Sequence, residues 1–353
     1  MNSQLAELMR RATAMTRTGD LAAAQALIRE AMGQQGPRAV DVIDVEAREY
    51  SEPQTEARPG AAPVTPAGVR ESSFISGTHA AAGLRCDYKL YIPPGSTAVD
   101  EKAPLIVMLH GCTQTPDDFA AGTRMNALAG ARGCYVLYPA QSQQMNAQRC
   151  WNWFKHSHQA RGRGEPALLE SLTRHVIDTH GIDNSRVFVA GLSAGGAMAA
   201  ILGNTYPETF AAVGVHSGLA AGAAHDLPSA LAAMRQGPTT TQNRPARQTP
   251  TIVFHGDADT TVHPRNAQAV VAAAAAGSAV HQNLSSTSPA GRAITRKVYL
   301  DEQGATLAEM WLVHGAAHAW AGGSAAGSYT DARGPDASAE MLRFFLERAR
   351  RTS

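Results

Sequence analysis

The residue whose setting points most clearly to chemistry is Ser193, which lies between spaced glycines in the segment 187–196, VFVAGLSAGG. The β-branched and aromatic residues before it predict a strand, and the run 197–202 (AMAAIL) predicts a helix. A serine on a sharp turn between a strand and a helix is the setting of a G-x-S-x-G nucleophile elbow. The turn raises the hydroxyl above the sheet edge, where the helix dipole favours developing negative charge. We therefore predict a catalytic nucleophile at Ser193, with a structural turn as the alternative.

A serine nucleophile needs a general base, and the base needs an acid that orients it. In chains with this elbow, the acid and the histidine follow the serine in that order, each at the carboxyl end of a later strand. The predicted strand 251–254 runs into a loop with two candidate acids, Asp257 and Asp259. Asp257 directly follows a glycine and is expected to brace the turn, whereas Asp259 lies deeper in the loop. We favour Asp259 as the orienting acid.

The loop after the predicted strand 309–313 offers two candidate bases, His314 and His318. His314 lies at the strand end, where a histidine is often only a hydrogen-bonded terminus. Small residues flank His318, and a base that reaches toward the serine needs such space, so we favour His318. His216 and His255 also follow predicted strands, and we interpret both as hydrogen-bonded polar residues near the sheet edge.

An anion site is needed to hold the oxygen that becomes negative when the serine attacks. In the α/β-hydrolase arrangement, one donor is the backbone N–H after the nucleophile, here Ala194, and the other comes from the loop after the third strand. The apolar strand 104–109 is followed by residues 110–114, HGCTQ. We place the second donor at Cys112, with Thr113 as the neighbour that could replace it.

Five separate motifs together carry a family resemblance. They are 109–114 (LHGCTQ), 115–126 (TPDDFAAGTRMN), 150–154 (CWNWF), 191–196 (GLSAGG) and 318–323 (HAWAGG). These motifs resemble the polyhydroxybutyrate (PHB) depolymerase family of esterases, which also holds feruloyl and acetylxylan esterases, and the resemblance covers about residues 70 to 350. It implies a serine esterase of the α/β-hydrolase fold with Ser193, Asp259 and His318 as its catalytic triad. The chain departs from the family at Ala321, because a serine often follows the tryptophan of the histidine loop.

The alternation of strand and helix patterns predicts an α/β fold with a mostly parallel central sheet flanked by helices. Strands are predicted at residues 87–92, 105–109, 135–138, 187–190, 211–216, 251–254 and 309–313. Helices are predicted at residues 116–131, 166–179, 265–276 and 336–350. Thr115 is the predicted cap of the first helix, Pro116 occupies its first turn, and the second helix is expected to end at Gly181.

Three regions differ in pattern along the chain. Residues 1–35 predict a helical hairpin, because apolar residues recur with helical spacing on either side of a Gly-Asp break. Residues 36–70 are rich in Pro, Ala, Glu and Arg without sustained periodicity, which predicts a flexible linker. Residues 71–353 are the predicted catalytic domain. Within it, the stretch 218–249 lies where lids are commonly inserted, and whether it covers the site stays open.

The composition agrees with a soluble enzyme. The 353 residues carry a formal net charge of +1, and no basic run with interleaved aromatics predicts nucleic-acid binding. No apolar run approaches the roughly 20 residues that a transmembrane helix needs. The first residues lack the basic and apolar regions of a signal peptide, which predicts a cytoplasmic location. The alternative is an extracellular location, as for many members of the family.

Cysteine usage leaves one question open. The four cysteines show no metal-type spacing, and a reduced state is the default in a cytosolic chain. Cys112 and Cys150 nevertheless both lie in motifs near the predicted site, and a disulfide between them is an open alternative. No metal or organic cofactor is predicted, since the sequence contains no H-E-x-x-H motif and no phosphate-cradling glycine loop.

We predict a serine carboxylic ester hydrolase of the polyhydroxyalkanoate-depolymerase kind, which cleaves a short-chain polyester or oligoester. The alternatives are a feruloyl or acetylxylan esterase, a serine peptidase of the same fold, and a granule-binding protein with a vestigial site. Trp151, Trp153 and Trp320 lie in loops near the predicted site, where they could hold substrate; the alternative is that they pack in the core. The hairpin 1–35 could dock on a polymer granule or associate with a second copy of itself.

Overall fold

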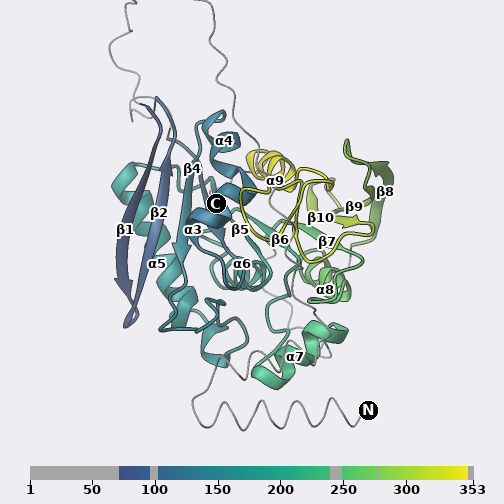
Figure 1. Cartoon of the computed structure of the whole chain (residues 1–353), viewed down its shortest axis with the longest axis horizontal. Coiled ribbons are helices and arrows are strands. Elements are labelled where there is room, and N and C mark those ends of the chain that lie inside the picture. Colours follow the sequence, from purple (N-terminus) through teal and green to yellow (C-terminus); the bar gives the residue numbers. More distant parts are fainter. Residues whose placement is uncertain (1–70, 96–101, 239–248, 277, 349–353) are drawn as a thin grey trace, which may run out of the picture. The chain divides into compact units, whose positions relative to one another are not determined.

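The computed structural model describes residues 71–95, 102–238, 249–276 and 278–348, which belong to one compact unit, Thr65–Ser353. A ten-stranded sheet runs through this unit, with helices on both of its faces (Figure 1). The predicted hairpin 1–35 and linker 36–70 lie outside the described residues, and so does part of the stretch 218–249, for which a lid role was left open. These domain assignments stay predictions.

The sheet has the strand order β1-β2-β4-β3-β5-β6-β7-β10-β9-β8. Its strands are β1 (Ser73–Ala81), β2 (Leu84–Ile92), β3 (Leu105–Leu109), β4 (Tyr135–Ala140), β5 (Val187–Leu192), β6 (Ala212–His216), β7 (Thr251–Gly256), β8 (Val280–Thr287), β9 (Ala293–Leu300) and β10 (Thr306–Val313). Along this strand order, each neighbouring pair from β4 to β10 is parallel. The remaining pairs, toward the two edges of the sheet, are antiparallel. The predicted α/β-hydrolase fold with a mostly parallel sheet is confirmed. Parallel strands end at the same edge of the sheet, so the loops that carry the predicted site residues leave it there.

Helices cover each face of the sheet and form a core with it. They are α3 (Pro116–Thr123), α4 (Met125–Gly130), α5 (Gly164–His180), α6 (Ala194–Thr205), α7 (Leu227–Gln236), α8 (Arg265–Ala274) and α9 (Ala337–Leu346). Side chains of α5, α6, α7 and α8 pack in the core on one face, and those of α3, α4 and α9 pack on the other. Because helices cover both faces, every residue of β3, β5, β6 and β7 is buried, which is why these strands are continuous apolar runs in the sequence.

The edge strands β1 and β8, and β9 next to β8, were not predicted. Every residue of β8 is exposed, and its sequence VHQNLSST has no apolar alternation. In β9, Ile294 and Val298 are buried on one face, but the residue between them on that face is Arg296, so the sequence shows no apolar alternation. These strands depend on pairing with a neighbour, and the sequence pattern alone does not reveal such pairing.

The helix predicted over 116–131 is wrong as one continuous element, because the chain breaks at Arg124. This residue adopts a left-handed conformation (φ 54°), and its guanidinium donates to the Gly322 carbonyl at 2.9 Å and pairs with Asp336 at 3.2 Å. These tertiary contacts accompany a break between α3 and α4. The predicted cap is confirmed, since the Thr115 hydroxyl accepts the Asp118 N–H. The predicted end of α5 at left-handed Gly181 is also confirmed.

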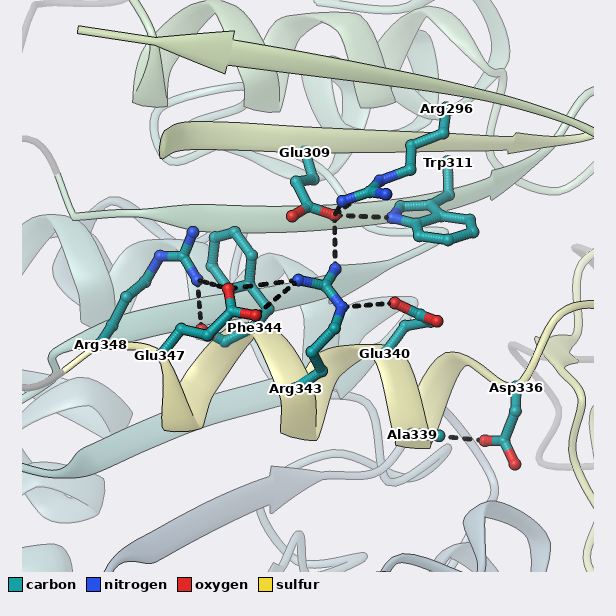
Figure 2. Close-up of polar contacts among 10 residues, drawn as sticks. All are labelled: Arg296, Glu309, Trp311, Asp336, Ala339, Glu340, Arg343, Phe344, Glu347 and Arg348. Atoms are coloured by element: carbon teal, nitrogen blue, oxygen red, sulfur yellow. Dashed lines mark hydrogen bonds and ion pairs between the residues drawn. The ribbon is translucent and has the colours of Figure 1, made fainter. Parts of the chain in front are cut away.

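A buried ionic cluster attaches α9 to β10, the strand that leads into the predicted histidine loop. Figure 2 shows Arg296 and Arg343 converging on the carboxylate of Glu309, which also accepts the Trp311 indole N–H at 3.2 Å. The guanidinium nitrogens lie 3.0 and 2.8 Å from Glu309 Oε2. Burial by itself would raise the pKa of Glu309, but the two guanidinium groups hold that pKa below its usual range. The cluster therefore keeps the carboxylate of Glu309, a residue of β10, charged although it is buried.

Candidate active site

Ser193 lies on a strained turn between β5 and α6. Its backbone is in the positive-φ region (φ 57°, ψ −118°), and its N–H donates to the His216 carbonyl at 2.8 Å. The flanking glycines are required by contact: a Cβ on Gly191 would lie 2.4 Å from the Gly195 backbone, and a Cβ on Gly195 would lie 2.0 Å from the Leu109 carbonyl oxygen. Strained positive-φ residues persist where the surrounding structure holds them. The geometry is that of the predicted elbow.

Asp259 and His318 form a hydrogen bond of 2.7 Å between Oδ2 and Nδ1. The other carboxylate oxygen of Asp259 accepts the backbone N–H groups of Thr261 (2.9 Å) and Val262 (2.8 Å). Burial alone would raise the pKa of this fully buried carboxyl, but bonds from His255 and His318 hold the pKa well below its usual range. Asp259 is therefore a charged acceptor that orients the ring of His318.

A second acid–histidine pair lies in the same two loops. His314 Nδ1 is 2.7 Å from Asp257 Oδ2, and the Gly315 N–H donates to the other oxygen of that carboxylate. The His314 and Asp257 side chains are 39% and 37% exposed, whereas those of the first pair are 12% and 0% exposed. The Nε2 of His314 is also engaged, at 2.8 Å from Thr295 Oγ1. His314 thus has both ring nitrogens in contacts, while no partner of His318 Nε2 is found among the described residues.

His216 joins the predicted nucleophile turn to the histidine loop. Its ring stacks on Trp320 with centroids 5.0 Å apart, and its Nε2 accepts the Ala321 N–H at 2.9 Å. Burial, and then the charges of His255 and His318, hold the pKa of His216 well below its usual range, so the ring is neutral. The interpretation of His216 as a hydrogen-bonded polar residue is confirmed. The sequence did not predict that His216 joins two loops, because the acceptor His216 Nε2 and the donor Ala321 N–H are far apart in the sequence.

The loop after β3 carries the predicted second oxyanion donor. Gly111 donates to the Gln114 side chain at 2.9 Å, and Thr113 has a left-handed backbone (φ 67°). The Thr113 N–H donates to the Gln148 carbonyl at 2.6 Å. Because this bond occupies the Thr113 N–H, the geometry favours Cys112 over Thr113 as the donor, and that assignment stays a prediction.

A disulfide between Cys112 and Cys150 settles the open question of their pairing. The bond ties the loop after β3 to the loop after β4 across 38 residues, while Cys86 and Cys134 are free and buried. Disulfides persist mainly in oxidising compartments. The pairing therefore fits an oxidising compartment better than the predicted cytoplasmic location, and the location stays a prediction.

The three tryptophans predicted near the site are buried. Trp151 and Trp320 are each 1% exposed, and Trp153 is 5% exposed. The indole N–H of Trp151 donates to the His110 carbonyl at 3.1 Å, and that of Trp320 donates to the Ser338 hydroxyl at 3.0 Å. These contacts support the packing alternative, and contact with substrate stays a prediction.

Within the described ranges, from residue 71 to residue 348 with their gaps, no helix has the length and apolar character needed to cross a membrane. Within the same residues, no group of three or more His, Cys, Asp or Glu side chains is arranged to hold a metal ion.

The chain is similar in sequence to known depolymerases and esterases. The chain is 32% identical over 243 residues to poly(3-hydroxyalkanoate) depolymerase C of Paucimonas lemoignei, covering 65% of this chain and 57% of the relative. It is 33% identical over 142 residues to feruloyl esterase B of Thermothelomyces thermophilus, covering 40% of this chain and 47% of the relative. The chain thus spans about half the length of these curated relatives.

Solved structures show the same fold. The acetyl xylan esterase from Aspergillus awamori matches with a TM-score of 0.56 at 21% identity, covering 66% of this chain and 89% of that structure. The profile of the family described as Esterase PHB depolymerase matches residues 86–285, more than half of the chain. The chain belongs to the Esterase PHB depolymerase family.

Proposed function

We propose that this chain is a serine carboxylic ester hydrolase with Ser193 as nucleophile, His318 as base and Asp259 as orienting acid. One observation carries the proposal: a buried, charged Asp259 accepts from His318 Nδ1, and among the described residues His318 Nε2 has no hydrogen-bond partner, so its lone pair is free. A histidine held in this way presents Nε2 as a proton acceptor. The elbow geometry of Ser193 and membership of an esterase family support the same assignment.

In the first half-reaction, Ser193 Oγ attacks the ester carbonyl carbon while His318 Nε2 takes the hydroxyl proton. The carbonyl oxygen becomes an oxyanion, which the backbone N–H groups of Cys112 and Ala194 stabilise. When the intermediate collapses, the bond to the alcohol oxygen breaks and His318 protonates the departing alcohol. The acyl group stays on Ser193 as an ester. Asp259 stabilises the imidazolium that forms in between.

In the second half-reaction, a water molecule replaces the alcohol. His318 takes a proton from the water as its oxygen attacks the acyl carbon, and the same two N–H groups hold the new oxyanion. Collapse of this intermediate releases the carboxylic acid, and His318 returns the proton to Ser193. No group outside the chain, the ester and water is needed for this balance.

The proposed substrate class is a short-chain polyester or oligoester of hydroxy acids. Similarity to poly(3-hydroxyalkanoate) depolymerase C supports this class, since that relative matches over more of this chain than feruloyl esterase B does. A feruloyl or acetylxylan ester is the second candidate, and the match to feruloyl esterase B and to the acetyl xylan esterase fold favours it.

The proposal is tested with short-chain p-nitrophenyl esters, a 3-hydroxybutyrate oligomer, a feruloyl ester, acetylated xylan and a peptide anilide. We expect hydrolysis of the simple esters and the oligomer, and little hydrolysis of the anilide. Ser193→Ala should lower kcat by at least about ten-thousandfold with unchanged secondary structure. Near wild-type turnover by this variant would remove Ser193 from the mechanism, and preference for the anilide would make the chain a peptidase.

A further inference from the structure

A cavity of about 630 Å³ opens beside the predicted oxyanion loop. Three segments line it: β2, the start of α3 with the residues before it, and the loop that follows β4. Its volume lies within the range of sites that bind small molecules, which is about 300–1,000 Å³. None of the predicted catalytic residues lines this cavity, so it is distinct from the nucleophile turn.

One guanidinium in the cavity wall lacks a counter-charge. Arg149 is half-buried, and among the described residues its side chain makes no hydrogen bond or ion pair. The other two charged lining residues, Arg85 and Asp87, pair with each other at 3.5 Å. The side-chain amides of Gln143 and Gln144 add neutral hydrogen-bond donors to the wall. The cavity thus offers one uncompensated positive charge among neutral donors, which matches a singly charged planar anion.

The cavity is mechanically joined to the predicted anion site. Arg149 directly precedes Cys150, whose disulfide partner is Cys112, and the Gln148 carbonyl accepts the Thr113 N–H. Gln114, two residues beyond Cys112, lines the cavity itself. Two residues of chain span at most about 7 Å. The backbone of Gln114, which lines the cavity, therefore lies within that distance of the backbone of Cys112.

We propose that this cavity binds the free carboxylate of an acid-ended oligoester whose scissile ester lies at Ser193. The inference rests on the proposed function, which supplies a hydroxy-acid oligomer with one acid end. Arg149 holds the carboxylate through its planar fork, which presents two parallel N–H donors to two oxygens. A phosphate dianion fits less well, because its second charge would meet the carboxylate of Asp87 with no second free cation in the wall.

The test compares two substrates that differ only at the acid end: the linear 3-hydroxybutyrate trimer and its methyl ester. For Arg149→Gln, the ratio of kcat/KM for the acid-ended trimer to kcat/KM for the methyl ester should fall about tenfold, through KM, since a charge-assisted bond is lost. Arg149→Lys keeps the charge but loses the planar fork, so its ratio of kcat/KM values should lie between those of the wild-type protein and Arg149→Gln. Arg132→Gln, on the exposed turn after α4 and away from the cavity, is the charge-matched control and should leave the ratio unchanged.

A separate arm identifies the source of the carboxylate. Free 3-hydroxybutyrate is added to wild-type protein and to Arg149→Gln during hydrolysis of each trimer. Competition against the acid-ended trimer alone, lost in Arg149→Gln, supports a site for the substrate's own end. An effect on the methyl ester that depends on Arg149 would instead identify a site for a separate acid, and would overturn the assignment.

The two proposals fail in different ways. If wild-type protein hydrolyses the methyl ester but the ratio is the same in Arg149→Gln, the carboxylate site is wrong and the esterase stands. If no ester is hydrolysed, the proposed function is wrong. Calorimetric binding of the acid-ended trimer to wild-type protein and to Arg149→Gln then decides whether the cavity binds a carboxylate.

Discussion

The imidazole Nε2 of His216 accepts a hydrogen bond from the backbone N–H of Ala321, 105 residues farther along the chain, at 2.9 Å. The carbonyl of the same histidine accepts the Ser193 N–H at 2.8 Å. Ala321 lies three residues beyond His318. His216 therefore couples the turn of the proposed nucleophile to the loop of the proposed base, although it belongs to neither.

We predict that His216→Phe lowers both stability and turnover. Phenylalanine keeps a ring to stack on Trp320, but it leaves the buried Ala321 N–H unpaired, which costs about 1–3 kcal/mol. The free energy of unfolding in urea and kcat on a p-nitrophenyl ester measure the two effects. His216→Gln retains an acceptor and should recover part of both. Wild-type stability and turnover in the phenylalanine variant would show that the bond is dispensable.

Asp259→Asn should lower kcat far more than Asp257→Asn. The first change removes the buried acceptor that orients His318, a loss of about ten-thousandfold in comparable triads. The second weakens a hydrogen-bonded contact between two side chains that are more than one-third exposed, which is worth at most about 1 kcal/mol. Steady-state kinetics on one soluble ester compare the pair directly. Equal losses, or losses in the reverse order, would mean that the acid is misassigned.

His318→Ala and His314→Ala form the matching comparison for the base. We expect His318→Ala to abolish ester turnover, because it removes the proton acceptor for Ser193. His314→Ala should reduce stability slightly and leave most of the turnover, since among the described residues the His314 ring hydrogen-bonds only Asp257 and Thr295. Loss of activity in the His314 variant alone would transfer the role of base to His314.

The Cys112–Cys150 disulfide is expected to support both stability and the proposed oxyanion donor. The double variant Cys112→Ser/Cys150→Ser should lose about 2–4 kcal/mol of unfolding free energy, given the 38 residues between the two cysteines. Its kcat should also fall, because the loop that holds the Cys112 N–H loses a covalent tie. Dithiothreitol should bring wild-type protein to the level of the variant and leave the variant itself unchanged. Wild-type kinetics after verified reduction would contradict this role.

A pH dependence of stability follows from His110. Burial lowers the pKa of His110 to about 4, against about 6.5 for an unperturbed histidine. As the pH falls below 6.5, the unfolded chain takes up a proton that the folded chain refuses, so stability present at neutral pH is lost toward pH 4. The shift corresponds to about 3 kcal/mol. We therefore expect the free energy of unfolding in urea to fall less between pH 7.5 and pH 4.5 in His110→Gln than in the wild-type protein. An equal fall in both proteins would show that His110 is not a source of the pH dependence.

Removal of residues 1–70 is predicted to leave hydrolysis of a small soluble ester intact, because every residue of the proposed triad and oxyanion hole lies between 112 and 318. The truncated and full chains would be compared on a p-nitrophenyl ester and on a polyester suspension. Loss on the suspension alone would support the docking hypothesis for the hairpin 1–35. Loss of folding or of soluble-ester turnover would show that this segment belongs to the catalytic domain.

The sequence by itself determined the features that depend on short-range sterics and composition. The glycines around Ser193 identify the elbow, because only glycine permits the close approach of β5, α6 and β3 that the structure shows. The buried parallel strands are continuous apolar runs, so their positions could be predicted. The cap at Thr115 and the end of α5 at Gly181 are equally local and were predicted for the same reason.

Tertiary structure decided which distant side chains meet. Strands β7 and β10 are neighbours in the sheet, with His255 opposite Leu312, so the two loops that follow them lie together and form two acid–histidine pairs of equal length. The pairs differ in burial and in the Thr295 contact to His314 Nε2, and both differences depend on the packing of the whole domain. The disulfide, the buried tryptophans and the lone guanidinium of Arg149 likewise depend on contacts between segments far apart in the sequence. Local sequence patterns do not reveal such contacts, because the packing of the complete chain sets the distances between segments that are far apart in the sequence.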